Sequence, residues 1–386
     1  MNKLFLSLLL IILPFIGISQ STIKGTILDA ETEQPIPYAS VYVNGSTIGK
    51  IADESGQFEL TLPAGNFELV ASFTGYQSLV YGISSDNTPS KITFKLVPLA
   101  MDLDEVVVDS KRDKAWYDNL KVFETFFLGE TSFSKDCEIL NKERLIMDFD
   151  PATSILKVMS NEPIKIENKA LGYNIEYLLA DFTYNGREGR VSFIGYPFFR
   201  EMEGNKRQER RWEENRKEAY LGSFTHFLKT LIEDKNLEDE GYIVRKVIRK
   251  EVEEPRKAGG ISISSQENQS VRVTPTSRKR MQDQLIIDKL SPADFFIANN
   301  GEYALNFDDI LQVQYNLQYE EQEYLLSTGQ TSRKRAPRTT LLLLQGDSAI
   351  IDSNGIPINP LDIFFEGYWG WEKTGNLLPL DYSLEN

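Results

Sequence analysis

The chain of 386 residues is poor in the side chains that bind soft metals, with one cysteine, Cys137, and one histidine, His226. A single cysteine excludes an intrachain disulfide. Zinc sites built from histidine and cysteine take three or four such ligands, which this chain does not have. We therefore expect neither a metal nor another cofactor.

Positive charge is scarce as well. Lysine and arginine number 42 against 57 aspartates and glutamates, which gives a formal net charge of −15. Binding to nucleic acid needs a cationic face that meets the phosphate backbone, so we expect no nucleic-acid partner. Beyond residue 18 the chain also lacks an apolar run of about 20 residues, the length that a transmembrane helix needs.

Sequence motifs for catalysis are missing too. The chain has no serine nucleophile elbow, no zincin helix and no phosphate-binding loop. No catalytic residue is therefore predicted. The 57 acidic residues leave one enzymatic alternative open, a hydrolase that works through a pair of carboxylates.

Residues 1–20 have the pattern of a secretory signal peptide. A positively charged start precedes an apolar run over residues 4–18, and Ser19 supplies a small residue near the predicted cleavage point. A retained membrane anchor is the alternative, but Pro14 and Gly17 interrupt the run. We expect cleavage after residue 19 or 20 and an exported protein that is periplasmic or associated with the outer membrane.

Residues 21–109 contain short runs in which apolar and polar residues alternate. Phe58 and Leu60, for example, flank Glu59. Alternation of period two, repeated about every ten residues, predicts an antiparallel β-sandwich. The seven predicted strands cover residues 22–28, 38–43, 57–62, 67–73, 76–81, 92–97 and 105–109.

Three motifs make this segment similar to the carboxypeptidase-regulatory-like domain. They are Gly25-x-Ile27-x-Asp29, Thr32-x-x-Pro35-Ile36-x-x-Ala39-x-Val41 and Gly49-x-x-Ala52-Asp53-x-x-Gly56-x-Phe58. The resemblance implies a transthyretin-like sandwich that has no cleaving activity of its own. It also implies an exported protein of the Bacteroidetes. Ala52 departs from the pattern, which usually has threonine there.

Two details of this segment have alternative interpretations. Asp53 and Gly56 could belong to a calcium loop or to a hairpin turn in which Asp53 caps backbone N–H groups; calcium takes six to eight oxygen ligands, so the turn is preferred. Leu103–Val108 resembles the lead-in to a TonB-dependent receptor. Such a receptor continues into 22 strands of about 9–11 residues, for which the rest of the chain is too short.

Residues 110–386 are predicted to form an α+β domain with an antiparallel sheet and two or three helices. Apolar residues from Trp116 to Phe127 fall on one face of a helix predicted over residues 111–129. A second helical region over residues 206–236 breaks at Gly222, and Ser223 is the predicted N-cap of the helix that follows. Parts of this domain resemble uncharacterised carboxypeptidase-regulatory-like proteins of Bacteroidetes, which brings no activity with it.

Trp212, Arg216, Tyr220 and His226 are the predicted binding residues. The first three are spaced four residues apart, so they form one ridge on a helix, and His226 lies on the next helix. One hypothesis is a binding ridge with a polar pocket. The alternative is structural: the arginine stacks on an aromatic ring and pairs with a carboxylate, while the histidine packs or caps its helix.

Two further clusters also have two interpretations each. Gly367–Trp371 is either an aromatic platform for a sugar or a plug that closes the end of the sheet. The string Thr-Ser-Arg-Lys-Arg occurs at both Thr276–Arg280 and Thr331–Arg335. These strings are either solvated loop tips or contacts for an acidic envelope surface.

Three hypotheses for function follow. The first is a non-enzymatic cell-envelope protein in which the β-sandwich is a docking or spacer module for a larger binding domain. The second is the carboxylate hydrolase, acting on peptide or glycan. The third is an accessory component of an outer-membrane TonB-dependent uptake system. The expected partner is an envelope protein or a glycan, and the oligomeric state is left open.

Overall fold

The computed structural model describes residues 21–99, 112–255, 277–299, 301–330 and 334–384. The predicted signal peptide and the predicted strand at residues 105–109 lie outside these ranges. The described residues divide into two compact units. Unit 1 takes them from Met1–Phe123, Cys137–Glu209 and Leu378–Asn386, and unit 2 from Glu124–Asp136 and Arg210–Leu377. The predicted domain boundary between residues 109 and 110 stays a prediction, because the division into compact units does not test it.

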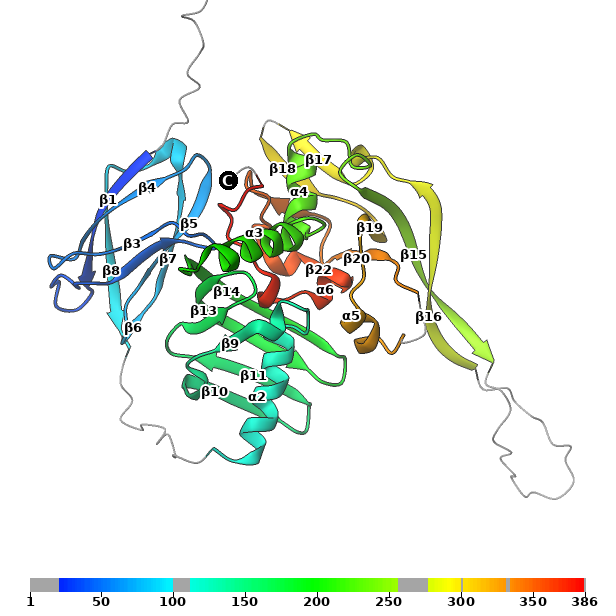
Figure 1. Ribbon diagram of the computed structural model, residues 1–386, viewed down its shortest axis with the longest axis horizontal. Coiled ribbons are helices and arrows are strands. Elements are labelled where there is room, and N and C mark those ends of the chain that lie inside the picture. Colours follow the sequence, from blue (N-terminus) through cyan, green and yellow to red (C-terminus); the bar gives the residue numbers. More distant parts are fainter. Residues whose placement is uncertain (1–20, 100–111, 256–276, 300, 331–333, 385–386) are drawn as a thin grey trace, which may run out of the picture. The chain divides into compact units, whose positions relative to one another are not determined.

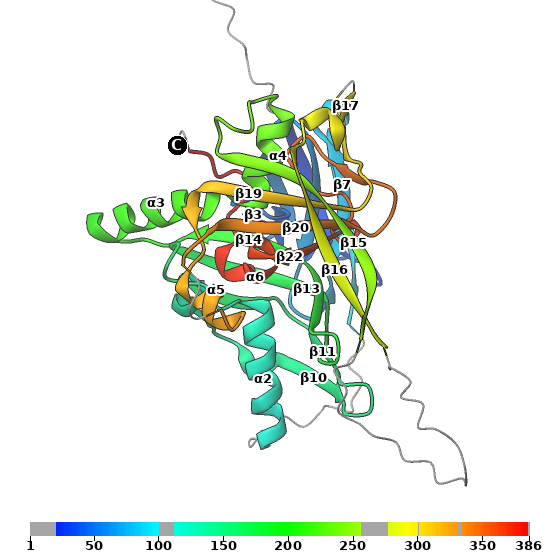
Figure 2. The ribbon, with the colours of Figure 1, turned by 90° about the vertical axis from the view of Figure 1, so that its right-hand side faces the viewer.

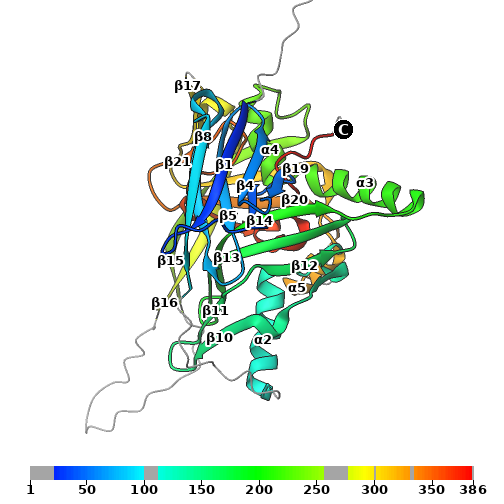
Figure 3. The same ribbon diagram turned by 90° about the vertical axis from the view of Figure 1, so that its left-hand side faces the viewer.

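The N-terminal part of unit 1 is a β-sandwich of two four-stranded sheets (Figures 1 and 3). In one sheet the order is β4 (Gln57–Leu62), β1 (Ser21–Asp29), β8 (Lys91–Pro98) and β6 (Tyr76–Gln77). In the other it is β3 (Gly49–Ile51), β2 (Ser40–Val43), β5 (Asn66–Ser72) and β7 (Leu79–Ser84). Phe58 and Leu60 point into the shared core, as alternation along a strand requires.

The predicted fold class is confirmed, and the strand count differs in detail. The described part of the sandwich has eight strands, where seven were predicted over the whole segment. Strand β3 was missed because its three residues, none of them buried, carry no alternation. The strand predicted over residues 76–81 divides into β6 and β7, which belong to different sheets.

A six-stranded antiparallel sheet completes unit 1. Its order is β10 (Leu145–Asp150), β11 (Ile155–Ser160), β13 (Tyr173–Asn185), β12 (Ile164–Asn168) and β9 (Cys137–Ile139), with β14 (Arg190–Glu201) paired to β13. Helix α2 (Lys114–Phe127) lies along this sheet (Figure 3). Its predicted apolar face is confirmed, since Leu120, Phe123 and Phe127 are buried. Phe123 meets Phe182 of β13 edge-on, with 4.8 Å between ring centroids.

The turn between β2 and β3 attaches the sandwich to this sheet. Ser46 forms a β-bridge with Phe198 of β14. Tyr42 stacks on the same phenylalanine, with ring centroids 4.8 Å apart. Gly49 lies so close that an added Cβ would be 2.6 Å from the Phe198 ring. The sandwich is therefore in tight contact with the larger sheet of its own unit.

Unit 2 is built on a five-stranded antiparallel sheet. Its order is β16 (Ser277–Lys289), β15 (Tyr242–Pro255), β19 (Ile310–Tyr319), β20 (Pro337–Leu344) and β22 (Ile363–Gly367). Figure 2 shows β15 and β16 as a long hairpin. A smaller sheet has the order β17 (Phe296–Asn299), β18 (Glu302–Leu305) and β21 (Ala349–Ile351).

Two helices, α4 (Phe224–Ile232) and α6 (Tyr368–Trp371), pack on one face of the larger sheet. The others here are α3 (Lys206–Tyr220) and α5 (Gln322–Ser327). Phe227 and Leu228 of α4 share a core with Val313 of β19 and Leu342 of β20. The described residues thus hold five helices where two or three were predicted, because α5 and α6 are too short to show helical periodicity. Short 3-10 helices occur at Ser85–Asn87, Ser134–Asp136, Lys142–Arg144, Pro292–Asp294, Pro360–Asp362 and Thr374–Asn376.

Within the described ranges, no helix has both the length and the apolar character needed to cross a membrane.

Candidate functional site

The four predicted binding residues lie on the predicted helices, three on α3 and His226 on α4. Trp212 and Arg216 are buried, with 6% and 9% of their surface exposed. Tyr220 and His226 come together, with 5.1 Å between ring centroids. Burial removes most of the surface of Trp212 and Arg216 from any ligand, which favours the structural interpretation for these two residues. Their binding role stays a prediction.

His226 is enclosed by hydrogen bonds. Its Nδ1 accepts the backbone N–H of Gly222 at 3.2 Å and lies 2.8 Å from the hydroxyl of Tyr242. Its own backbone N–H donates to Oγ of Ser223, which confirms the predicted N-cap. Burial lowers the pKa of His226, although the carboxylate of Glu240, 3.5 Å from Nε2, opposes this. The ring is therefore a neutral link between α4 and β15.

The aromatic cluster at Gly367–Trp371 packs inside unit 2. The indole of Trp369 contacts the rings of Phe224 at 5.3 Å and Phe227 at 5.7 Å, measured between centroids. Its Nε1 donates to the carbonyl oxygen of Gly222 at 2.7 Å. Tyr368 is completely buried. This arrangement favours the plug over the sugar platform.

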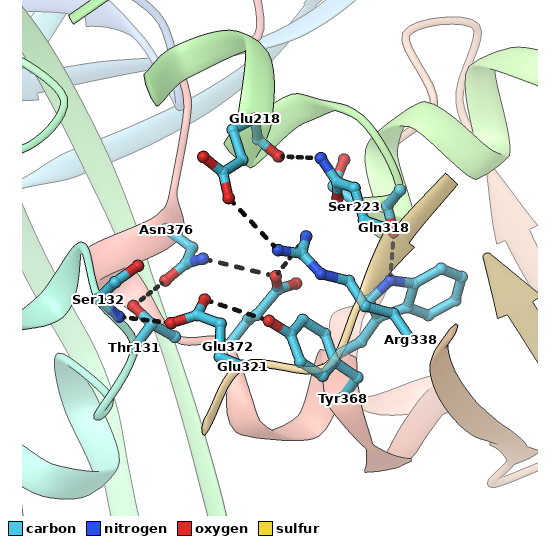
Figure 4. A network of polar contacts seen from close by, with 12 residues as sticks. Thr131, Ser132, Glu218, Ser223, Gln318, Glu321, Arg338, Tyr368, Glu372 and Asn376 are labelled. Carbon is cyan, nitrogen blue, oxygen red and sulfur yellow. Dashed lines mark hydrogen bonds and ion pairs between the residues drawn. The ribbon is translucent and has the colours of Figure 1, made fainter. Parts of the chain in front are cut away.

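A network of polar side chains adjoins the plug (Figure 4). Arg338, 6% exposed, lies over the ring of Tyr368 at 4.6 Å and forms long ion pairs with Glu372 at 3.8 Å and Glu218 at 3.9 Å. The hydroxyl of Tyr368 donates to Glu321 at 3.1 Å. Burial raises the pKa of Glu372 to about 7, against the pull of Arg338. A carboxyl with this pKa changes its charge near neutral pH.

A groove of about 750 Å³ lies on the opposite face of the larger sheet. Gln312 and Gln314 line it, whereas Leu311 and Val313, which alternate with them on β19, point into the core. The strand register shows that the lining continues across neighbouring strands of the sheet. Arg245 of β15 pairs with Gln312, Gln312 with Leu341 of β20, and Leu341 with Glu366 of β22. These four residues form one row across four strands, and all of them line the groove.

One arginine links three strands of the larger sheet. Arg249 of β15 contacts Asp283 of β16 through Nε at 2.7 Å and Glu366 of β22 through Nη2 at 2.7 Å. In the sheet order β15 and β22 are three strand spacings apart, roughly 14 Å, so two long side chains span the two strands between them. Arg249 lowers the pKa of Asp283, and the two carboxylates raise that of Arg249.

Strand β16 supplies the apolar wall of the groove. Leu285 and Ile287 line it, with 45% and 83% of their surface exposed. Met281, 54% exposed, and Asp283 follow at the same two-residue period, so all four side chains share one face of the strand. An isoleucine exposed to this degree beside a groove marks a surface that a ligand can cover.

Gln312 supplies a half-buried polar group on the floor, without a protein partner among the described residues. Gln314 is engaged, since its Oε1 accepts from Arg245 and its Nε2 donates to Asn316. The carboxamide of Gln312, by contrast, has no hydrogen-bond partner in the part of the chain that the structure describes. It lines the groove with a donor and an acceptor both available.

None of the four residues predicted from the sequence lines this groove. The alternation at residues 310–315 predicts that Gln312 faces away from the core. It does not show whether that face lines a groove or is simply solvated, because both cases give the same pattern. The contribution of Glu366 has no local signal, because it depends on the pairing of β20 with β22.

The described residues contain no group of three histidine, cysteine, aspartate or glutamate side chains placed to hold a metal ion. Asp53 makes the contacts expected of a hairpin turn. Its Oδ1 accepts the backbone N–H groups of Ser55 at 2.8 Å and Gln57 at 2.9 Å.

The fold and this site define a mainly β protein in which a sandwich accompanies an α+β unit with an open groove. Residues 23–108 match the family model for the CarboxypepD_reg-like domain, so the N-terminal segment is a domain of this kind. The match does not extend to unit 2. Among curated proteins, no sequence matches this chain.

Solved structures that match the chain share limited similarity with it, as two of them show. One is catechol 1,2-dioxygenase from Acinetobacter sp. ADP1, with 17% identity and a TM-score of 0.19. The match covers 26% of this chain and only 59% of the dioxygenase. The other is a putative membrane-associated protein of unknown function from Bacteroides fragilis NCTC 9343, with 11% identity over 90% of this chain and 98% of that one, and a TM-score of 0.16. These TM-scores are too low to support any inference about function.

Proposed function

We propose that this protein is a non-enzymatic binding protein of the cell envelope, and that the groove of unit 2 is its ligand site. The observation that carries the proposal is the free carboxamide of Gln312 on the floor of a groove whose wall exposes Ile287. Ligand sites typically combine apolar lining with a few polar groups that fix orientation. Both kinds of group are present here before any ligand binds.

The charges at the groove favour binding over catalysis. A hydrolase that works through two carboxylates needs them about 5–10 Å apart and free to reach the substrate. The lining contains two carboxylates, Glu320 and Glu366. Glu320 is 3% exposed, and Glu366 is held by Arg249, which also holds Asp283. Glu372, whose raised pKa would suit a general acid, does not line the groove. No observation favours the hydrolase or the accessory to a TonB-dependent uptake system.

The location in the envelope rests on the leader pattern at residues 1–20. The sandwich is proposed as the docking module, which its tight contact with the neighbouring sheet supports. Fractionation of the producing bacterium tests the location. We expect the processed chain in the periplasm or with the outer membrane. Full-length chain with an intact leader in the cytosol would contradict it.

A photo-crosslinking residue tests the groove inside the cell. We expect p-benzoylphenylalanine at position 312 to form an adduct on irradiation, because position 312 lies on the groove floor. The matched control carries the same residue at position 350, where Ile350 of β21 is 57% exposed and does not line the groove. The absence of an adduct at 312, or equal adducts at both positions, would refute the proposed site.

A further inference from the structure

We infer that the ligand of this groove is an extended peptide segment, which lies along β16 with apolar side chains against Leu285 and Ile287 and its main chain within reach of Gln312. The inference rests on the proposed function. It adds the chemical class of the ligand, which is argued from the arrangement of apolar and polar groups along the groove.

The apolar wall matches a chain with a period of two residues. The side chains of Met281, Leu285 and Ile287 stand on one face of β16 and are all about half exposed or more. Within the described residues, β16 pairs only with β15, so it is an edge strand. In an extended peptide every second side chain points the same way, so one row of apolar side chains can cover this wall. From Met281 to Ile287 the strand runs for about 20 Å, the length of six or seven extended residues.

The floor matches a peptide main chain. The carboxamide of Gln312 offers one acceptor and two donors, which complement the N–H and C=O of a peptide unit. Next to it, the guanidinium of Arg245 donates to Oε1 of Gln314 at 3.2 Å, so these two side chains already have a partner in each other. A main chain that lies here replaces the water on Gln312 with hydrogen bonds of the same kind.

Other ligand classes fit this lining less well. An acyl chain has no polar group for Gln312, so its binding would bury that carboxamide without a partner, which is costly. A glycan recognised in this manner needs aromatic faces on which its rings stack. Tyr324 is the one aromatic residue of the lining, and its ring is in edge contact with Tyr368 at 5.3 Å and with Trp371 at 5.4 Å.

The net charge of the groove and its surroundings indicates which peptides can bind. Arg249 shares its one positive charge between Asp283 and Glu366, so the three together carry one negative charge. The lining adds Arg245 and Glu320, which cancel each other formally. A peptide with neutral or basic side chains is therefore expected, whereas an acidic peptide is repelled.

The test is selection from a displayed library of random linear 12-residue peptides, with the purified full chain as bait. Enriched sequences are synthesised with a fluorophore, and their affinities are measured by fluorescence polarisation. We expect Ile287→Asp to weaken binding at least tenfold and Gln312→Leu to weaken it several-fold. Ile350→Asp, a matched change at another exposed isoleucine, leaves the affinity unchanged. Position 287 is 83% exposed, so Ile287→Asp is expected to fold, and circular dichroism checks this.

Three alternative outcomes would each overturn the inference. Peptides that bind all three variants equally well place their site outside the groove. If no peptide is enriched but a fluorescent fatty acid binds the wild type and loses affinity with Ile287→Asp, the ligand class is wrong and the groove remains a binding site. If neither probe binds and position 312 gives no adduct in cells, the inference and the proposed function both fail.

Discussion

Glu372→Gln tests whether a buried carboxyl makes the stability of unit 2 depend on pH. Its side chain is 13% exposed, and burial raises its pKa from 4.5 to about 7. A rise of this size corresponds to about 3 kcal/mol. Because the folded-state pKa exceeds the unfolded value, this contribution is present below pH 4.5 and is lost as the pH rises through 7. About 2.5 kcal/mol of the change falls between pH 5 and pH 8.

The assay is urea-induced unfolding at pH 5 and pH 8, followed by tryptophan fluorescence. A Trp116→Phe background leaves Trp212, Trp369 and Trp371, which all belong to unit 2. We expect the wild type to lose about 2.5 kcal/mol more than Glu372→Gln between the two pH values, because the amide cannot ionise.

The control for this prediction is Glu218→Gln. Glu218 also pairs with Arg338, at 3.9 Å, but its side chain is 56% exposed, so solvent screens the interaction. This variant should keep the pH dependence of the wild type. The reasoning is wrong if Glu372→Gln loses as much stability as the wild type, or if Glu218→Gln behaves like Glu372→Gln.

Two further predictions concern packing. Gly49→Ala places a Cβ 2.6 Å from the Phe198 ring, and we expect it to lower the free energy of unfolding by about 1–3 kcal/mol in urea titrations. Gly82→Ala, in β7 of the same sheet with nothing within 4 Å, should stay near the wild type, and equal midpoints for the two variants would argue against the contact. Tyr242→Phe removes the hydroxyl that lies 2.8 Å from the histidine ring on α4, for an expected cost of about 1–2 kcal/mol. Tyr319→Phe, at a residue that is 59% exposed, is its control in the same titration, and an equal cost would show that the hydroxyl contact contributes nothing.

Local patterns in the sequence were enough to predict most of the elements. The period of two at residues 57–62 and the helical period from Trp116 to Phe127 reflect the geometry of a single strand or helix. The cap at Ser223 depends on its neighbours in the chain, so it was predictable for the same reason. Short elements such as β3 and α6 were not predicted, because three or four residues do not complete a period.

The groove was decided by the tertiary structure alone. Gln312 and Glu366 share its lining only because β19 pairs with β20 and β20 pairs with β22. Ile287 belongs to an apolar run that would suit a core strand, yet it is 83% exposed, since no element of the described chain covers that face of β16. A sequence pattern shows which residues share a face of one strand. Which strands pair, and which face the core covers, depends on contacts between residues far apart in the chain.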